Sequence, residues 1–270
     1  MSDEKKVVVI TGASGGIGAA LAEEFASKKF KVVIAARNSQ KLEGLRKKLQ
    51  QSGNEVLSVI CDVSIEGDCK KLIAETIHGF GKIDVLICNA GISMRALFND
   101  TELDVLKKVM AVNFWGTVYC AKYALPYLLK SKGSLVGISS IAGKKGLPGR
   151  TGYSASKFAM EGFLETLRTE NLKKNLHVLV ACPGFTATEI RKNALSENGK
   201  PQALSPRTEE KMMKPEKVAS HIYNAVINRK RDLLLTGNGK VTVWMNKFFP
   251  SLMDKLVYNH MAKEKDSPFK

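Results

Sequence analysis

Tyr153 and Lys157 stand four residues apart in the sequence YSASK (153–157). On a helix, residues i and i+4 share a face, so the phenol and the ammonium group would point the same way. An ordinary tyrosine has a pKa of about 10 and is a poor base at neutral pH, but a nearby positive charge favours the phenolate. The pair could therefore exchange a proton with a substrate, or it could be an ordinary surface pair. The spacing alone does not decide.

A glycine-rich turn lies near the N-terminus, in VVVITGASGGIG (7–18). Gly12, Gly16 and Gly18 follow an apolar run and precede an amphipathic one, which is the position of a strand-to-helix turn. Glycines there allow the backbone to approach a diphosphate, and the helix N-terminus offers free amides and the positive end of a dipole. Ser14 lies in the same turn and could donate a further hydrogen bond. The motif predicts a dinucleotide site.

The next apolar run, VVIAARN (32–38), indicates which dinucleotide would bind. A carboxylate at its end would hold the ribose hydroxyls of NAD. Here Ala36 stands at the end of the run and Arg37 follows it. A guanidinium pairs well with phosphate oxygens because its planar fork can donate two parallel hydrogen bonds. We therefore predict NADP as the cofactor.

Apolar runs and amphipathic segments alternate along the chain. The runs are rich in Val, Ile and Leu without strict alternation, as in strands that are buried on both faces. This order predicts a doubly wound α/β fold: a seven-stranded parallel sheet with helices on both faces. The predicted strands are 6–11, 31–36, 55–60, 83–88, 133–139, 177–182 and 232–236. The predicted helices are 17–28, 39–51, 66–80, 104–130, 152–173 and 216–229.

Two segments depart from this alternation within what we predict to be one domain, 1–270. Residues 185–214 are polar and contain no predicted strand, so we interpret them as a mobile flap over the site, with a plain surface loop as the alternative. Residues 237–263 predict a basic amphipathic helix or helix pair, broken at Pro250 and rich in aromatic side chains. Such a stretch could contact a membrane surface, a partner subunit or the substrate entrance.

Composition excludes several other classes of protein. The net charge of +16 comes without a recognition helix or zinc-finger signature, so we expect no nucleic acid as a partner. The five cysteines show no CxxC spacing and the four histidines form no cluster, which predicts reduced thiols and no metal site. MSDEKKVVVITG has no apolar signal-peptide region, and no apolar run reaches the length of about 20 residues that a membrane span needs. We expect a cytoplasmic protein.

Several further motifs occur in the same order and spacing as in one known family. They are CDV (61–63), NAG (89–91), Asn113, Ser140 and PGFTAT (183–188), together with the glycine turn and YSASK. From about residue 5 to residue 235, the chain resembles the short-chain dehydrogenase/reductase family. The C-terminal stretch 237–263 resembles the NADP-dependent branch that contains microsomal corticosteroid dehydrogenases and related lipid or retinoid reductases. The resemblance implies a Rossmann fold and, from the long helices 104–130 and 152–173, a homodimer or homotetramer.

The resemblance also implies roles for individual residues. Tyr153 would be the acid/base, Lys157 its partner, Ser140 the residue that orients the substrate oxygen, and Asn113 the relay. Ser139 is adjacent, and only the family spacing of 13 residues to Tyr153 selects Ser140. The implied cofactor-binding residues are Gly12, Ser14, Gly16, Ile17, Gly18, Arg37, Asp62, Val63, Asn89, Ala90, Gly91, Tyr153, Lys157, Pro183, Gly184, Thr186 and Thr188.

The sequence thus predicts an NADP(H)-dependent oxidoreductase that interconverts an alcohol with a ketone or aldehyde on a hydrophobic substrate. One alternative is a reductase of a carrier-linked 3-oxoacyl chain. Another is a non-catalytic NADP-binding sensor, although such a protein would not need both Tyr153 and Lys157. A serine hydrolase is rejected, because GISSIAG (137–143) lacks the GxSxG turn. Residues near Ser93, Met94, Leu147 and Pro148 would shape the substrate pocket.

Overall fold

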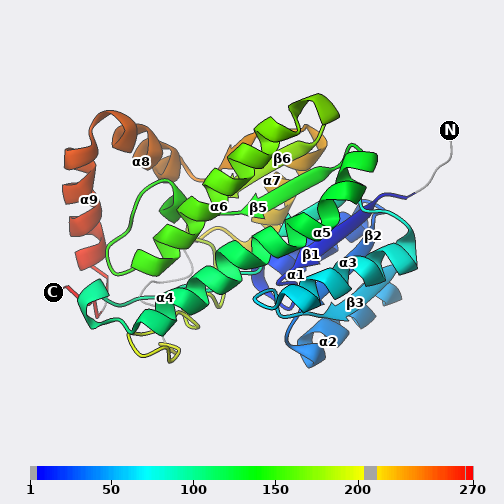
Figure 1. Ribbon diagram of the computed structural model, residues 1–270. Helices are drawn as coiled ribbons and strands as arrows, with labels where there is room; N and C mark the ends of the chain where they lie inside the picture. The colour runs from blue at the N-terminus through cyan, green and yellow to red at the C-terminus, as the bar shows by residue number, and fades with distance from the viewer. Residues whose placement is uncertain (1–4, 204–211, 265, 270) are drawn as a thin grey trace.

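One parallel sheet of seven strands forms the centre of the molecule, in the order β3-β2-β1-β4-β5-β6-β7 (Figure 1). The computed structural model describes residues 5–203, 212–264 and 266–269. The strand order reverses its direction between β1 and β4, and ligands of such sheets bind at the carboxyl ends of the strands beside this point. The strands are β1 (Val7–Thr11), β2 (Lys31–Ala36), β3 (Val56–Ile60), β4 (Val85–Cys88), β5 (Ser134–Ile138), β6 (His177–Cys182) and β7 (Asp232–Leu234).

Helices cover both faces of the sheet, so the predicted doubly wound Rossmann fold is confirmed. Helices α1, α2 and α7 pack on one face, and α3, α5 and α6 pack on the other (Figure 1). The helices are α1 (Gly16–Ser27), α2 (Ser39–Gln51), α3 (Glu66–Phe80), α4 (Leu103–Met110), α5 (Gly116–Lys130), α6 (Thr151–Glu170), α7 (Pro215–Ile227), α8 (Gly237–Phe248) and α9 (Pro250–Ala262).

The two faces of β1 explain why the strands read as continuous apolar runs. Val8 and Ile10 belong to the core beneath α1 and α7, whereas Val7 and Val9 belong to the core beneath α3 and α5. Successive side chains of a strand point to opposite faces, so a strand covered on both sides needs apolar residues at every position. All four of these side chains are fully buried.

The predicted helix 104–130 differs from the structure in its middle. The chain forms α4, then a π-helical turn at Ala111–Trp115, then α5. A π-turn widens the helix by one residue and often occurs at functional sites. The end of the predicted helix 152–173 also differs, because α6 ends at Glu170 and a short 3-10 turn follows.

The predicted flap is described only in part, since 204–211 lie outside the described residues. Its residues 185–203 run beside the loop that follows β4. The Leu195 amide donates to the Ser93 carbonyl at 2.9 Å, and the Gln202 side chain donates to the Arg95 carbonyl at 2.7 Å. These hydrogen bonds place the segment over the carboxyl ends of the strands. Its mobility stays a prediction.

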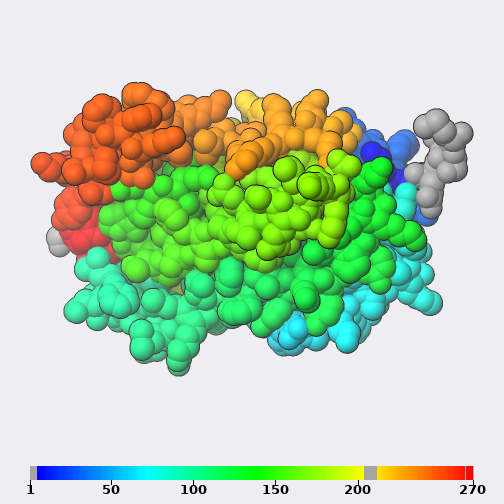
Figure 2. Space-filling view, turned by 45° about the horizontal axis from the view of Figure 1, so that its top comes forward, coloured from blue at the N-terminus to red at the C-terminus, as the bar shows by residue number. Residues whose placement is uncertain are grey.

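The C-terminal stretch 237–263 folds as two helices, with Pro250 in the first turn of α9. Proline suits this position because its missing amide would have no helical partner there. The pair stands at one end of the molecule, coloured orange to red in Figures 1 and 2. Met253, Val257 and Met261 turn one side of α9 inward to pack with Leu147. No helix within the described residues is both long and apolar enough to cross a bilayer.

Candidate active site

The glycine turn after β1 leaves no room for a side chain. Gly12 has a φ of +66°, and a Cβ atom on it would lie 2.7 Å from the Cα of Ala90. A Cβ atom on Gly18 would lie 2.2 Å from the Gly12 carbonyl oxygen. Real Cβ contacts are longer than this, so glycine is required at both positions. The close approach brings the turn 12–18 against residues 89–90 at the end of β4. We call these two segments together the glycine cradle.

Asn89 fastens this cradle. Its Nδ2 donates to the carbonyl oxygens of Thr11 at 2.9 Å and Gly12 at 3.2 Å. The Thr11 hydroxyl in turn accepts from the backbone amides of Asn89 and Ala90, each at 3.1 Å. These hydrogen bonds pair the backbone carbonyl and amide groups at the point where the strand order reverses. They also hold the ends of β1 and β4 in register.

Arg37 and Asp62 lie at the carboxyl ends of β2 and β3, with Nη1 of Arg37 3.6 Å from Oδ2 of Asp62. Burial acts to raise the pKa of Asp62, but hydrogen bonds from Ser64 and the charge of Arg37 hold it below its ordinary value. Arg37 is largely exposed. Val63 is buried and packs against Gly116, so of the CDV residues Asp62 is the one that reaches the surface.

A cavity of about 140 Å³ lies beside the cradle. It brings together many of the predicted residues from α1, α6 and the segments that follow β4, β5 and β6. Arg37, Asp62 and Val63 are not among the described residues that line it. The predicted residues that do line it are Ile17, Asn89, Gly91, Ser140, Tyr153, Lys157, Pro183, Gly184, Thr186 and Thr188. Gly16 lies next to Thr188, since a Cβ atom on it would be 3.1 Å from Cγ2 of that residue. Ser14 lies half-buried in the glycine turn.

Lys157 lies one helical turn after Tyr153 on α6, as the i, i+4 spacing predicts. Its Nζ is 5.8 Å from the centre of the Tyr153 ring and donates to the Ile138 carbonyl at 2.7 Å. Burial lowers its pKa to about 8, while Cys182 and Glu161 act in the opposite direction. An ammonium group whose pKa lies this close to neutrality can gain or lose its proton in the physiological range.

Tyr153 has a raised pKa, and burial is the largest cause. A hydrogen bond with Ser140 and the charge of Arg150 act to lower it. A nearby positive charge thus acts to favour the phenolate, as expected, but desolvation of the phenolate outweighs this effect and the net shift is upward. The effect of Lys157 and of a bound oxidised nicotinamide stays a prediction. A phenol in this environment keeps its proton at neutral pH.

The structure distinguishes the two adjacent serines. Ser139 donates to Oε1 of the buried Glu161 at 2.5 Å. Ser140 instead acts to lower the pKa of Tyr153 and lies on the wall of two cavities. Of the pair, Ser140 is the one beside the phenol.

Asn113 is fully buried in the π-turn and is held by three hydrogen bonds. Its Oδ1 accepts from the Ile92 amide at 2.8 Å, and its Nδ2 donates to the Ile92 carbonyl at 3.0 Å and to Ser156 at 2.9 Å. A Cβ atom on Gly91 would lie 3.2 Å from this Oδ1 and 3.5 Å from Nζ of Lys157. The widened turn thus places an amide oxygen near the ammonium group.

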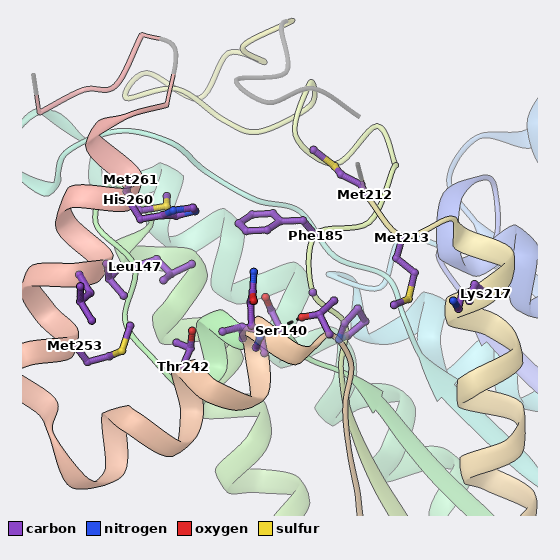
Figure 3. A pocket seen from close by; sticks show the side chains of 18 of the residues that line it. Ser140, Leu147, Phe185, Met212, Met213, Lys217, Thr242, Met253, His260 and Met261 are labelled. Carbon is purple, nitrogen blue, oxygen red and sulfur yellow. Dashed lines mark hydrogen bonds between the residues drawn. The ribbon is translucent and has the colours of Figure 1, made fainter. Parts of the chain in front are cut away.

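A larger cavity, of about 840 Å³, opens on the other side of Ser140 (Figure 3). Leu147, Phe185, Met253 and Met261 give it a mainly apolar wall, and Thr242 and His260 add polar groups. In Figure 3, Ser140 lies at its base, while His260 and Met261 project from α9 on the far side. Both cavities share Ser140, Leu147, Pro183, Gly184 and Phe185 as lining residues, so they adjoin at Ser140, while the Tyr153 phenol lines the smaller one.

Some lining residues were not predicted from the sequence. Arg150 and Arg191 line the smaller cavity and are each only 6% exposed. Arg191 donates to the Thr186 carbonyl at 2.7 Å and so fixes the loop after β6. Arg150 precedes α6, so no helical spacing in the sequence signals it. Of the predicted pocket residues, Leu147 lines both cavities and Ser93 the smaller one, but Met94 is fully buried and Pro148 borders a separate surface hollow.

Comparison with protein families identifies the chain. A family model described as short chain dehydrogenase matches residues 6–199, which is most of the chain. The chain therefore belongs to the short-chain dehydrogenase family, whose fold binds a nicotinamide dinucleotide.

Two curated relatives show the range of similarity. The chain is 35% identical over 267 residues to mouse dehydrogenase/reductase SDR family member 7B, with 97% of this chain and 83% of the relative covered. It is 44% identical over 187 residues to 11-beta-hydroxysteroid dehydrogenase-like 2 of Arabidopsis thaliana, with 68% and 60% covered. These relatives agree with the branch that the C-terminal stretch indicated.

Solved structures support the same fold. A short-chain dehydrogenase/reductase from Burkholderia phymatum in complex with NAD has a TM-score of 0.83 at 26% identity, with 93% of this chain and 96% of that chain covered. An alcohol dehydrogenase from Thermococcus sibiricus complexed with 5-hydroxy-NADP has a TM-score of 0.74, also at 26% identity, with 86% and 96% covered. One neighbour is bound to NAD and the other to a modified NADP.

Proposed function

We propose that this protein is an NADP(H)-dependent oxidoreductase that interconverts a hydrophobic ketone or aldehyde with the corresponding alcohol. One observation carries the proposal: the Tyr153 phenol, one helical turn from Lys157, lines the cavity beside the glycine cradle, and Ser140 on the same wall also lines a large apolar cavity. A dinucleotide on one side and a carbonyl substrate on the other would both reach this phenol.

In the direction of reduction, Tyr153 gives its proton to the carbonyl oxygen. NADPH, when bound, supplies the hydride that reduces the carbonyl carbon. Ser140 donates a hydrogen bond to the oxygen as negative charge develops on it. Lys157 stabilises the phenolate that remains, since a cation nearby favours the charged form. Because its pKa is raised, Tyr153 stays protonated at neutral pH until the carbonyl oxygen of the substrate accepts the proton. Asn113 holds Ile92 and Ser156 and so maintains the position of Lys157.

NADP rather than NAD is favoured by Arg37. It stands at the end of β2, where it could bind a 2′-phosphate, and its exposure leaves the guanidinium accessible to a ligand. The glycine turn leads directly into α1, whose first amides could bind a dinucleotide diphosphate, and Gly15 in this turn has no atom within 4 Å of the place of a Cβ. The residues that would hold the cofactor are those predicted above, from Gly12 to Thr188.

The large cavity favours a free hydrophobic substrate. Its volume of about 840 Å³ lies within the range of ordinary small-molecule sites. Methionine side chains on α9 and in the segment before α7 can adapt to bulky apolar groups. The steroid dehydrogenase-like name of one relative is in keeping with this substrate class. A carrier-linked acyl chain remains the alternative.

We further propose one catalytic domain that acts in the cytoplasm as a homodimer or homotetramer. All five cysteines are buried free thiols, as suits a reducing compartment. Exposed apolar side chains on α4, the π-turn and α6, namely Leu103, Trp115 and Phe158, provide a surface for a second copy. The exposed side of α8 and α9 is a surface for peripheral contact with a membrane.

The first test is loss of NADPH absorbance against a panel of steroid, retinoid, aromatic and acyl-chain carbonyls. We expect turnover with at least one hydrophobic carbonyl, a sharp fall when NADH replaces NADPH, and a loss of at least about a hundredfold in kcat for Tyr153→Phe. Turnover that survives in Tyr153→Phe would refute the proposed acid. Tight NADPH binding with no turnover on any carbonyl would favour the sensor.

A further inference from the structure

The chain beyond α9 returns to the active site. In Figure 1 it turns back towards the loop that precedes α4. There Glu264, which is 6% exposed, places its Oε2 3.5 Å from Nε of Arg95 and 3.7 Å from Nη2 of Arg150. Arg95 belongs to the loop after β4, and Arg150 immediately precedes α6. One buried carboxylate therefore joins the C-terminal segment to two segments of the active site.

Arg150 is held close to the phenol by its other contacts. Its Nη1 lies 3.4 Å from both the Ser93 hydroxyl and the Met94 carbonyl oxygen. The residue lines the same cavity as Tyr153. A buried cation acts on a neighbouring phenol more strongly than an exposed one, because little water screens its charge.

We propose that Glu264 is a positioning residue for the reaction: it holds Arg150 beside Tyr153 and, through that guanidinium, sets how readily the phenol releases its proton. The inference rests on the proposed role of Tyr153 as the acid/base. It gives the C-terminal segment a part in the chemistry as well as in the wall of the substrate cavity.

Other groups also act on this phenol. Lys157 lies one helical turn along α6, Cys182 on β6 acts to raise the pKa of the phenol, and Ser140 after β5 acts to lower it. Arg150 faces Glu264, which it shares with Arg95. Substitutions at 150 and 264 change the charge of the Arg150–Glu264 pair. They leave Lys157, Cys182 and Ser140 in place.

The test reads the proton of Tyr153 directly and needs no substrate. Near-ultraviolet absorbance of tyrosinate is followed as the pH of the NADP⁺ complex is raised, and the same titration of Tyr153→Phe in each background is subtracted. Glu264→Gln keeps a side chain of the same length and an oxygen that can hold Arg150 in place, but it removes the negative charge that opposes the guanidinium, so we expect the pKa of Tyr153 to fall by about one unit. Arg150→Met removes the positive charge, so we expect it to rise by about the same amount. Arg150→Lys and Glu264→Asp keep the charges and should stay near the wild-type value.

The double variant Glu264→Gln/Arg150→Met distinguishes an action of Glu264 through Arg150 from the entry of water into the site. If Glu264 acts through Arg150, the double variant titrates like Arg150→Met alone. If loss of Glu264 merely admits water, the pKa of Tyr153 falls in both backgrounds, and the inference is overturned. It is also overturned if both single variants leave the titration unchanged. A Tyr153→Phe enzyme that retains turnover would refute the proposed function instead, so the two failures are distinguishable.

Discussion

At the scale of single residues, burial sets the chemistry of α6. Tyr153 and Lys157 carry opposite kinds of charge when ionised, and removal from water favours the neutral form of each. The pKa of Tyr153 is therefore raised, and that of Lys157 is lowered to about 8. Near neutral pH the pair is best described as a phenol that holds its proton beside an ammonium group that is close to losing its own.

A pH dependence follows from these directions. Lys157 is charged below its pKa of about 8 and neutral above it. Its charge would stabilise the phenolate formed in reduction, so we expect kcat/KM for reduction to fall as the pH rises through about 8. The measurement is a pH profile with NADPH and the best carbonyl from the panel.

Lys157→Arg is the control for this profile, since a guanidinium stays charged across the range. The variant should be slower, but its activity should no longer fall near pH 8. A fall that persists unchanged in Lys157→Arg would assign the titration to another group. The phenol is a poor candidate for that group, because its raised pKa keeps it protonated there.

At the scale of elements, α8 and α9 each serve the site with one side and face solvent with the other. Trp244, Phe248 and Phe249 are 58%, 57% and 53% exposed. Lys240 and Lys247 lie on the same helix, α8. Aromatic side chains beside lysines suit the interface of an anionic membrane, where the rings enter the headgroup layer and the amines meet phosphates.

We expect the protein to sediment with phosphatidylserine-containing vesicles and to be released by salt. Trp244→Ser/Phe248→Ser should weaken this binding by about a hundredfold or more, because each ring contributes on the order of 1.5–3 kcal/mol when it is buried. Phe98→Ser, which changes an exposed aromatic residue elsewhere, should bind like the wild type. If the double variant instead lowers the oligomeric state without changing vesicle binding, the surface belongs to a second copy.

At the scale of the whole molecule, stability depends on the sheet that separates the two helical layers. Leu86 lies in β4, near the middle of the sheet, and is fully buried. Leu172 follows α6 and is 70% exposed. The two leucines have the same chemistry in opposite environments, so they make a matched pair.

Leu86→Ala should lower the free energy of unfolding by about 2–5 kcal/mol, because it removes buried methyl groups and leaves a cavity. Leu172→Ala should change it by less than about 0.5 kcal/mol. Denaturant unfolding followed by circular dichroism measures both. Equal effects of the two substitutions would mean that the sheet is not the cooperative core of this protein.

Much of the architecture could be predicted from local pattern. Runs such as VVVIT (7–11) are apolar at every position, which is a property of strands buried on both faces, and the structure has them as parallel strands. The π-turn at Ala111–Trp115 could not be predicted, because a one-residue widening leaves the helical periodicity of the flanking segments almost unchanged.

The sequence by itself determined the elements, their order and the glycine cradle, because these depend on the period of apolar residues and on the one residue type that a close backbone approach permits. It also placed Tyr153 and Lys157 on one side of a helix. Only the tertiary structure decided the direction of their pKa shifts, since burial is a property of the surrounding chain. It also decided that Arg150 and Glu264, 114 positions apart, would meet beside the phenol. No local pattern encodes that contact, because it depends on how α9 returns across the end of the sheet.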